Sequence, residues 1–553
     1  GGSGIYNHGK LTIFGGTIGT AQGGEGKSSG SGNGGHGIYS KTMEILGGII
    51  QKAIGGNANG NTCTGGSGIH SDGTLTISGG EIQQATGGDS TGISGKGGTG
   101  IRGDQVVKIS GGAIGSAKGG SGDSGGAGIG TGAKPAFATE INISGGTITE
   151  ATGGTGGAGI GSGSNSSTAT TINIIGGTIK NATGTDGGAG IGGGKNSSGA
   201  ANVNISSGEV HASTGSGNGG AAIGGGKNSS GATNVNISGG EVNASTGYGN
   251  GGAGIGSGKQ SKGKTKIDIS GDALVSAGSS GSAAIGSGES STGETTINIH
   301  DTNPEKGVKS AFAYGGAGIG SGRYAKGKTY VTISNASVST LESSNASYTN
   351  ASGAGIGTGY GSQSNADITI TESTVKAVGG TGAAIGSGSE GDVLSRPTGD
   401  PNTFKTIIRI TDSNVTASSG PSAAIGSGSY STNATEIHIN GGKIEASNYS
   451  GSAIGSGDSA KGKTGIYITG SNVTATADIG TGIGSGISSS GETTIDISGG
   501  TVTAMGGGDG YDGSAGIGSG SHSTGYTHIT LHDGVTVKAT GGGNSSLGGG
   551  GGA

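Results

Sequence analysis

The sequence holds one cysteine, Cys63, no tryptophan, four phenylalanines and five prolines in 553 residues. A single cysteine excludes a disulfide framework and a cysteine-based metal or redox site. Scarce proline, and glycine that does not fall at every third position, exclude a collagen triple helix. No apolar run approaches the roughly 18 residues of a membrane helix, so we expect no direct membrane insertion. The net charge of -5 at pH 7 predicts no strong attraction to nucleic acid.

Glycine is abundant instead, with 144 residues, and much of it belongs to a repeat. The motif Gly-Ala-Gly-Ile-Gly-Ser-Gly, or a close variant, recurs along nearly the whole chain. Repeats of about 30 residues that cannot bury their own apolar side chains must stack on their neighbours. The motif therefore predicts one continuous solenoid over residues 1–553. The isoleucines at its centre lie 31, 31, 32, 32 and 30 residues apart at Ile129, Ile160, Ile191, Ile223, Ile255 and Ile285.

One coil, residues 156–184, shows how the repeat is built from three short extended segments separated by glycine corners. Ile172 and Ile174 alternate with Asn173, which is the period of a half-buried strand. The first segment is expected to bury only Ala158 and Ile160, and the third to turn Ile179 and Ala182 inward. Helix is disfavoured because each interior glycine costs about 1 kcal/mol. We expect an all-β parallel β-helix (β-solenoid), right-handed by the rule for parallel crossovers, with about seventeen coils of roughly 30 residues and three short strands each.

The third segment of the coil changes along the chain. Coils before about residue 200 contain Ile-x-x-Ala, as at 148–151, and later coils mostly contain Val-x-Ala, as at 242–244. Residues 1–200 and 201–553 are therefore predicted to be two subtypes of coil. Inserted loops are predicted near 343–351 and 390–404, and such loops often carry the specific contacts of a solenoid.

Several short motifs suggest chemistry that their context does not support. Residues 258–265, 322–329 and 457–464 match the phosphate-binding loop pattern, but that motif needs a following helix and a strand is expected here. Residues 507–514 resemble a single calcium-binding nonapeptide, although neighbouring turns must share each ion. His528 and His532 share a strand parity, yet two exposed solvated histidines are the simpler interpretation. We expect no cofactor and no metal site.

The outward positions of the second segment are expected to form one row along the coils. Acidic residues such as Asp268 and Asp496 stand alone there, and no pair of stacked carboxylates suited to polysaccharide cleavage results. We therefore expect the chain not to be an enzyme. Asparagines dominate the row instead, and stacked amides would hydrogen-bond along the axis of the solenoid. The members of this row are Asn142, Asn173, Asn204, Asn236 and, two coils later, Asn298.

Two further sets of residues are candidates for surface functions. Sequons of the type N-x-[ST] would accept glycans in a secretory eukaryotic host. Their asparagines are Asn142, Asn204, Asn236, Asn335, Asn345, Asn414, Asn433 and Asn472. Three tyrosines follow the glycine motif and are candidate surface contacts, since aromatic rings are common in binding surfaces: Tyr324, Tyr360 and Tyr430.

The combination of G-G-A-G-I-G-S-G with T-I-N-I-S-G-G-T-I resembles the glycine-rich repeat regions of large bacterial cell-surface and cell-wall-associated proteins, which are taken to be β-solenoids. The resemblance covers nearly the whole chain. It is less similar to the passenger domains of polymorphic outer-membrane autotransporters, whose F-x-x-N motif is missing here. The resemblance implies an extracellular, non-catalytic stalk, adhesin or matrix component.

Three hypotheses about function follow. The first is a rigid structural protein of the cell surface or extracellular matrix, whose uncapped ends predict end-to-end association of copies into a filament. The second is an adhesin that binds glycans through its inserted loops and exposed tyrosines. The third is a polysaccharide-degrading enzyme, which would need carboxylates within catalytic reach on one face.

Overall fold

The computed structural model describes residues 1–27, 32–216, 219–340, 352–390, 402–508 and 512–543. Within these residues the chain is a parallel β-solenoid of about 16 turns with about 32 residues each, and it contains no helix. The predicted fold class is confirmed. None of the described segments forms a helix long and apolar enough to cross a membrane.

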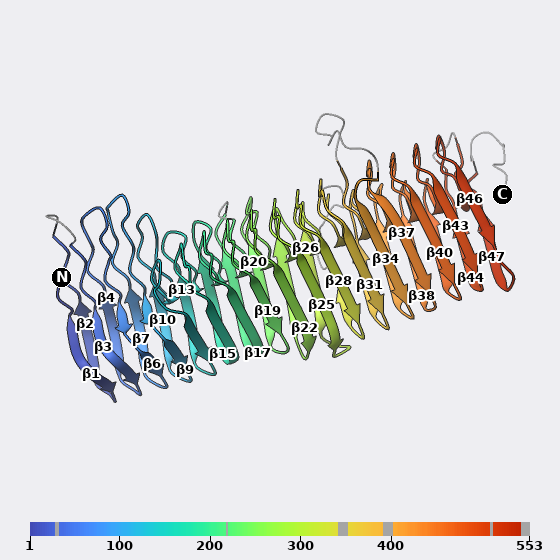
Figure 1. Ribbon diagram of the computed structural model, residues 1–553. Coiled ribbons are helices and arrows are strands. Elements are labelled where there is room, and N and C mark those ends of the chain that lie inside the picture. Colours follow the sequence, from blue (N-terminus) through green and yellow to red (C-terminus); the bar gives the residue numbers. More distant parts are fainter. Residues whose placement is uncertain (28–31, 217–218, 341–351, 391–401, 509–511, 544–553) are drawn as a thin grey trace. The chain divides into compact units, whose positions relative to one another are not determined.

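The chain divides into two compact units. Unit 1 comprises Gly1–Asp268, Asp272–Ser280 and Ser291–Gly293, and unit 2 comprises Ile269–Gly271, Gly281–Ser290 and Glu294–Ala553. Within each unit, every strand pairs in parallel with its counterpart in the neighbouring coil, as the stacked arrows of Figure 1 show. Parallel pairing follows from the coil itself, because each turn returns the chain to the same side in the same direction.

Unit 1 holds the strands β1 to β23, apart from Ile269–Gly271 at the end of β22, which belong to unit 2. The first two coils join their first and second segments in β1 (Ile5–Ile13) and β3 (Ile38–Ile45), while β15 (Thr170–Gly184) and β17 (Ala201–Thr214) join the second and third. The other first segments are β5 (Ile69–Ser71), β8 (Ile101–Gly103), β11 (Ile129–Gly130), β14 (Ile160–Gly161), β16 (Ile191–Gly192), β18 (Ile223–Gly224) and β21 (Ile255–Gly256). The other second segments are β6 (Thr74–Ile77), β9 (Val106–Ile109), β12 (Thr139–Ile143), β19 (Thr233–Ile237) and β22 (Thr265–Gly271). The other third segments are β2 (Thr17–Gln22), β4 (Ile49–Ile54), β7 (Glu81–Thr86), β10 (Ala113–Lys118), β13 (Thr147–Thr152), β20 (Glu241–Thr246) and β23 (Leu274–Ser279).

Unit 2 repeats the three segments regularly. Its first segments are β24 (Ile285–Gly286), β27 (Ile319–Gly320), β30 (Ile356–Gly357), β33 (Ile385–Gly386), β36 (Ile425–Gly426), β39 (Ser452–Gly455), β42 (Thr481–Gly484) and β45 (Ile517–Gly518). Its second segments are β25 (Thr295–Thr302), β28 (Thr329–Ser334), β31 (Ala366–Thr371), β34 (Lys405–Thr411), β37 (Ala434–Asn440), β40 (Thr464–Thr469), β43 (Thr493–Ser498) and β46 (Thr527–Leu531). Its third segments are β26 (Gly307–Ala313), β29 (Ser337–Ser339), β32 (Thr374–Val378), β35 (Asn414–Ser419), β38 (Lys443–Asn448), β41 (Asn472–Ala477), β44 (Gly500–Met505) and β47 (Val535–Thr540).

The core consists of aliphatic rows that run from coil to coil. In the coil of residues 156–184, the predicted inward side chains Ile160, Ile172, Ile174, Ile179 and Ala182 are all fully buried. Each pairs with the equivalent residue of the next coil, so isoleucine stacks on isoleucine or valine. Full burial of one such side chain stabilises the fold by about 1.5–3 kcal/mol. The rows therefore replace the single globular core that a chain of this length would otherwise need.

The glycine after the central isoleucine forms a wall where coils touch through their backbones. Gly161 has φ of 140°, and a Cβ added to it would lie 2.0 Å from the carbonyl oxygen of Gly192. Gly192 meets Gly224 in the same way at 2.0 Å. A side chain is excluded here both by the backbone conformation and by the neighbouring carbonyl.

A register shift marks the change in the third segment. Ile179 of β15 pairs with Val210 of β17, but Ala182 pairs with Ala212, so one residue fewer spans the same distance. The shift lies where the sequence changes from Ile-x-x-Ala to Val-x-Ala. The inward alanine keeps its place because the irregularity is absorbed between the two buried positions.

Closer to the N-terminus, between the fourth and fifth coils, the long loop of the coil moves from one corner to another. Ile69 and Leu75 are six positions apart, whereas the equivalent Ile129 and Ile141 are twelve apart. The difference is offset at another corner, since Ala85 and Ile101 lie sixteen positions apart but Ala151 and Ile160 only nine. The coil keeps its length. The first four coils consequently lack the loop that follows the first segment in all later coils of unit 1.

The predicted motifs and loops can now be placed. The three phosphate-loop matches are followed by strands β22, β28 and β40 rather than by helices, so the helix N-terminus that the motif requires is missing. The predicted loop 343–351 lies outside the described residues, as do residues 391–401 of the loop 390–404 and residues 509–511 of the calcium-like turn.

Candidate functional site

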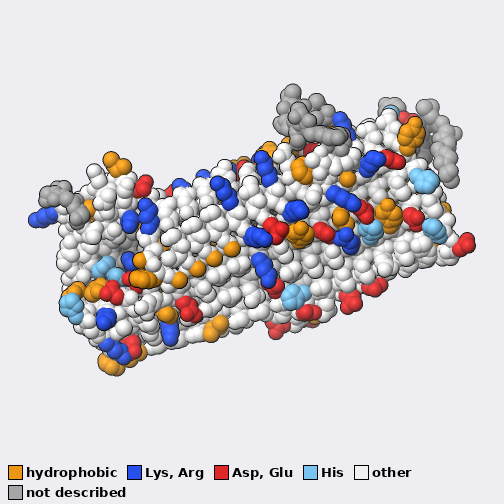
Figure 2. Space-filling view, viewed as in Figure 1, with side chains coloured by type: hydrophobic (Ala, Val, Ile, Leu, Met, Phe, Trp, Pro, Cys, Tyr) orange, Lys and Arg blue, Asp and Glu red, His pale blue; other side chains and the backbone are white. Residues whose placement is uncertain are grey.

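The position after the central isoleucine carries large side chains in the first four coils. Strand pairing aligns Tyr6 with Tyr39, Tyr39 with His70, and His70 with Arg102. Arg102 then pairs with Gly130, where the glycine wall begins. The four side chains are accommodated because the following loop is absent from this corner. On the face drawn in Figure 2, histidine, acidic and hydrophobic side chains gather over the first strands of unit 1.

Aromatic rings stack along this column. The rings of Tyr6 and Tyr39 lie 5.1 Å apart with planes at 10°, and His36, which precedes β3, stacks on Tyr39 at 5.5 Å and 15°. The His36 and His70 rings meet at 4.4 Å with planes at 65°. Ring contacts of this kind add about 0.5–1.5 kcal/mol beyond the area they bury.

Two carboxylates complete the cluster at the ends of β5 and β8. Tyr39 donates its hydroxyl hydrogen bond to Asp72 Oδ2, and Arg102 Nε donates to Asp104 Oδ1 at 2.5 Å. His70 Nε2 lies 3.4 Å from Asp104 Oδ1 and 3.7 Å from Asp72 Oδ1. Together with Tyr6, which stacks on Tyr39, these residues come from the first four coils, and we call them the four-coil cluster: Tyr6, His36, Tyr39, His70, Asp72, Arg102 and Asp104.

The cluster perturbs its own ionisable groups. Burial, together with the neighbouring His70 and Arg102, lowers the pKa of His36 to about 3, so His36 is neutral at physiological pH. The hydrogen bond to Asp72 and burial raise the pKa of Tyr39 to about 12. Burial alone would raise the pKa of Asp104, but the facing His70 and the Arg102 guanidinium outweigh it and hold the pKa below its usual value. Opposite charges near a carboxylate act in this direction.

Three donor atoms of the cluster converge on one point. His70, Asp72 and Asp104 each offer one ligand atom within 4.8 Å of the others, and among the described residues they form the one group of three or more histidine, cysteine or acidic side chains with this property. No metal site was expected from the sequence, and these residues were not among its candidates. The sequence did contain a signal for this cluster. In the first four copies of the motif, the isoleucine is followed not by glycine but by a large side chain: Tyr6, Tyr39, His70 and Arg102. The remaining histidine pair, His528 and His532, is exposed, and His532 instead contacts Asp496 at 3.0 Å.

The predicted asparagine row is confirmed over three coils. Asn173 Nδ2 donates to Asn142 Oδ1 at 2.8 Å, and Asn204 Nδ2 donates to Asn173 Oδ1 at 2.8 Å. A second row runs beside it, in which Asn234 Nδ2 donates to Asn202 Oδ1 at 2.8 Å. All three donors point toward the N-terminal side of the chain, so the amide dipoles are aligned.

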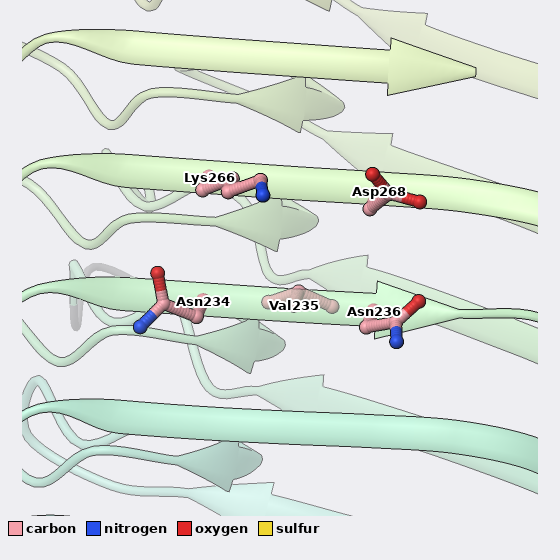
Figure 3. A pocket seen from close by; sticks show the side chains of 5 residues that line it. All are labelled: Asn234, Val235, Asn236, Lys266 and Asp268. Carbon is pink, nitrogen blue, oxygen red and sulfur yellow. The ribbon is translucent and has the colours of Figure 1, made fainter. Parts of the chain in front are cut away.

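The second row ends where the next coil carries two charged residues. Figure 3 shows Asn234 and Asn236 on β19 facing Lys266 and Asp268 on β22, where they line an open hollow of about 390 Å³. The carbonyl oxygen of Asn234 is directed toward the strand that carries Lys266. A cation is suited to this place because it faces the carbonyl ends of aligned amides.

The candidate glycosylation sites differ in accessibility. Asn236, Asn335, Asn414 and Asn472 are exposed, Asn142 and Asn204 are half-buried within strands, and Asn433 is buried at 3% exposure. Asn345 lies outside the described residues. A glycan on Asn204 would be attached to the nitrogen that donates the ladder bond to Asn173, and one on Asn433 would have no room.

Two of the three candidate tyrosines are brought together. The rings of Tyr324 and Tyr360 meet edge to face with centroids 5.6 Å apart. Arg323 lies over both rings, 4.7 Å from the Tyr324 centroid and 5.3 Å from that of Tyr360, and its Nη2 donates to the Tyr324 hydroxyl at 2.9 Å. Tyr430 is exposed at 43% and has no recorded ring contact with this pair.

Comparison with known proteins identifies the repeat. The beta helix repeat family matches eight segments of the chain, which begin at the first buried isoleucine or valine of the second segment and cover most of a coil. The segments are 141–164, 172–195, 203–227, 235–259, 368–389, 408–429, 437–458 and 495–521. The chain is thus a β-solenoid protein with beta helix repeats. No curated protein and no solved structure matches the chain significantly. All matched segments lie beyond residue 140, in the coils that follow the four-coil cluster.

Proposed function

We propose that the chain is a non-catalytic structural protein of the cell surface or extracellular matrix, in which stacked coils form stiff units. The glycine wall is the observation that carries the proposal. Consecutive backbones touch at Gly161, Gly192 and Gly224 so closely that a single added carbon would lie about 2 Å from the next carbonyl oxygen. Bending a unit toward this wall would press backbone against backbone, which close-packed interiors resist.

The surface chemistry is consistent with a structural role outside the cell. Asparagine ladders tie neighbouring coils through side chains as well as through the backbone, and charged residues make up only 11% of the chain. The extracellular location is proposed because the repeat resembles those of bacterial cell-surface proteins.

End-to-end association belongs to the same proposal. Ile529 and Leu531 of β46 continue the inward rows of β43, whose Ile495 and Ile497 are buried. Ile529 and Leu531 are 42% and 51% exposed, so the described coils leave these rows uncovered. A further coil, either of the same chain or of a second copy, would bury them. Sedimentation velocity over a range of concentrations tests self-association, and a strictly monomeric species at high concentration would contradict it.

Localisation is tested on native cells with an antibody raised against the purified chain. The proposal expects labelling of intact cells and loss of the label after brief treatment with an external protease. Labelling that appears only after permeabilisation would overturn the extracellular assignment. Single-molecule pulling on the purified chain tests stiffness separately, because a structural unit should extend in steps at high force rather than as a compliant coil.

A second candidate function, glycan binding, is favoured by specific surface features. The Tyr324–Tyr360–Arg323 contact presents aromatic rings and a guanidinium, which suit sugar rings and their substituents. In the same unit, Tyr467, Glu436, Lys463 and Glu492 line an open hollow of about 340 Å³, within the size range of small-ligand sites. A glycan array probed with the wild-type chain and with Tyr324→Ala tests this function, and an array without hits removes it.

A further inference from the structure

The four-coil cluster contains a buried polar atom that has no hydrogen-bond partner. The His70 side chain is only 8% exposed, and its Nε2 atom lies away from solvent without a hydrogen bond. Its contacts to Asp72 and Asp104, at 3.7 and 3.4 Å, are within range for ion pairs but lack hydrogen-bond geometry. A buried nitrogen of this kind costs about 1–3 kcal/mol unless something satisfies it.

The two carboxylates that face this nitrogen are each held by a neighbouring side chain, Asp72 through the oxygen turned away from His70 and Asp104 through Oδ1, the oxygen nearest His70. Tyr39 holds Asp72 through Oδ2, so the Oδ1 atom of Asp72 is turned toward His70. Arg102 holds Asp104, and His36 contacts the other ring nitrogen of His70. The two carboxylates thus each have an outer partner, as metal ligands in proteins do, whereas the contact from His36 acts on the tautomer of His70.

We propose that His70 Nε2, Asp72 and Asp104 form a binding site for a first-row divalent transition ion such as Zn²⁺, whose occupancy is opposed by His36. One imidazole and two carboxylates suit Zn²⁺, which accepts both nitrogen and oxygen ligands at about 2.0–2.2 Å. The donors lie within 4.8 Å of one another, so small side-chain movements would bring them around one ion. This site goes beyond the structural role proposed above and does not depend on it.

The opposition by His36 follows from the direction of the hydrogen bonds. The backbone N–H of Ser67 donates to His36 Nδ1 at 2.8 Å, so a neutral His36 carries its proton on Nε2 and donates it to His70 Nδ1 at 3.1 Å. Neutral His70 then carries its own proton on Nε2, the atom that faces the carboxylates. A metal-bound His70 needs the reverse arrangement, with the proton on Nδ1 and an acceptor beside it. Metal binding must therefore displace His36 from its bond with Ser67.

Replacing His36 by glutamine separates this proposal from adventitious binding. A glutamine side chain can turn its carbonyl oxygen toward His70 Nδ1 and accept the hydrogen bond that a metal-bound His70 would donate. We expect His36→Gln to bind Zn²⁺ about tenfold more tightly than wild type, because the donor that fixes the wrong tautomer is gone. Surface histidines that bind zinc nonspecifically would lose affinity, not gain it, when a nearby histidine is removed.

The experiment is isothermal titration of the full chain with Zn²⁺. The expected result is one saturable site per chain, at least tenfold weaker in Asp72→Asn and in Asp104→Asn. His532→Ala, which removes an exposed histidine that also contacts an aspartate, is the matched control and should leave the affinity unchanged. Circular dichroism melting of each variant shows whether the solenoid is intact. Because Asp72 is 44% exposed, its variant is the one expected to fold like wild type.

Four outcomes would overturn the proposal. The site itself is refuted if neither wild type nor His36→Gln binds Zn²⁺ saturably, or if Asp72→Asn and Asp104→Asn bind as wild type does. The opposition by His36 is refuted if His36→Gln binds more weakly than wild type while remaining folded. Equal affinity for Mg²⁺, which prefers oxygen ligands in octahedral geometry, would refute the assignment of a transition ion.

Discussion

Substituting one glycine of the wall should destabilise the solenoid locally and strongly. In Gly192→Ala the new Cβ would lie 2.0 Å from the carbonyl oxygen of Gly224, and the residue would have to keep φ at 133°. The unfavourable backbone conformation costs about 1–3 kcal/mol, and forcing a methyl group into a close-packed contact costs about 1–3 kcal/mol more. The neighbour cannot yield easily, because the clash is with backbone that is itself part of the next coil. We expect a local loss of about 3 kcal/mol or more.

Native-state hydrogen exchange is the appropriate assay, since stacked repeats unfold in parts rather than in one step. A loss of about 3 kcal/mol corresponds to roughly 100-fold faster exchange, at about 1.4 kcal/mol per factor of ten. Peptides that contain Ile191 and Ile223 should show it, while peptides several coils away should exchange as in wild type. Mass spectrometry of pepsin fragments resolves the two groups.

Gly15→Ala is the matched control for the glycine-wall prediction. A Cβ at Gly15 would have nothing within 4 Å, and its φ is not in the left-handed region. Alanine there should be neutral or stabilising by about 0.4–1 kcal/mol, because it restricts the unfolded chain. If Gly192→Ala exchanged as slowly as wild type, the close backbone contact would not be what makes this position glycine.

Three further predictions test the ladder, the ion pairs and the sequons. Asn173→Ala removes one donated and one accepted ladder bond and should cost about 2 kcal/mol by local hydrogen exchange; Asn298→Ala, whose register partner is Thr332, is the control and should change it by less than about 0.5 kcal/mol. The hydrogen bond from Lys405, with help from His438, holds the pKa of Glu436 below its usual value of 4.5. The folded state therefore gains stability from ionised Glu436 above pH 4.5 and loses it as the pH falls below that value; melting curves of wild type should show this loss, and a Glu436→Gln variant with the same acid dependence would contradict it. In a eukaryotic secretory host, mass spectrometry of the folded secreted chain should find glycans at exposed Asn414 and Asn472 but none at Asn433, which is 3% exposed; a glycan at Asn433 in folded protein would refute its burial.

The fold could be predicted because the same pattern of inward and outward residues recurs in many coils. Ile172 and Ile174 alternate with Asn173, and the same alternation recurs in coil after coil, so an error in one coil is corrected by the others. Burial of Ile160, Ile179 and Ala182 followed from the same pattern and is confirmed. Which corner carries the long loop was not predicted, because moving residues from one corner to another leaves the spacing of the isoleucines unchanged.

The asparagine ladder was predicted from side-chain parity and is confirmed where identical residues stack. Asn142, Asn173 and Asn204 are hydrogen-bonded in series, while Asn236 pairs with Asn204 in register without a recorded ladder bond. Parity places a side chain on a face, but it does not fix the rotamer that an amide needs for a linear hydrogen bond.

The four-coil cluster was missed for a different physical reason. Members that come from different coils, such as His70 and Asp104, are 30 or more positions apart along the chain, and they meet only because strand pairing places the corner of one coil beside the same corner of the next. A sequence search for metal ligands looks for short spacings such as those of zinc fingers. In a solenoid the relevant spacing is one coil, so a ligand search has to be made along the repeat rather than within it.

The glycine wall also explains where chemistry can reside in this protein. A residue held at φ near 140° with a carbonyl 2 Å from its Cβ, as at Gly161, cannot carry a functional side chain, and the same contact recurs at Gly130, Gly192 and Gly224 and at the equivalent glycines from Gly286 to Gly484. The position opens only where the following loop has moved to another corner, which happens in the first four coils. Tyr6, Tyr39, His70 and Arg102 occupy it there. Relocation of the loop is therefore the structural event that permits the cluster. Transplanting the short corner into a later coil should allow His or Tyr at the wall position, whereas the same substitution without the short corner should destabilise the coil as Gly192→Ala does.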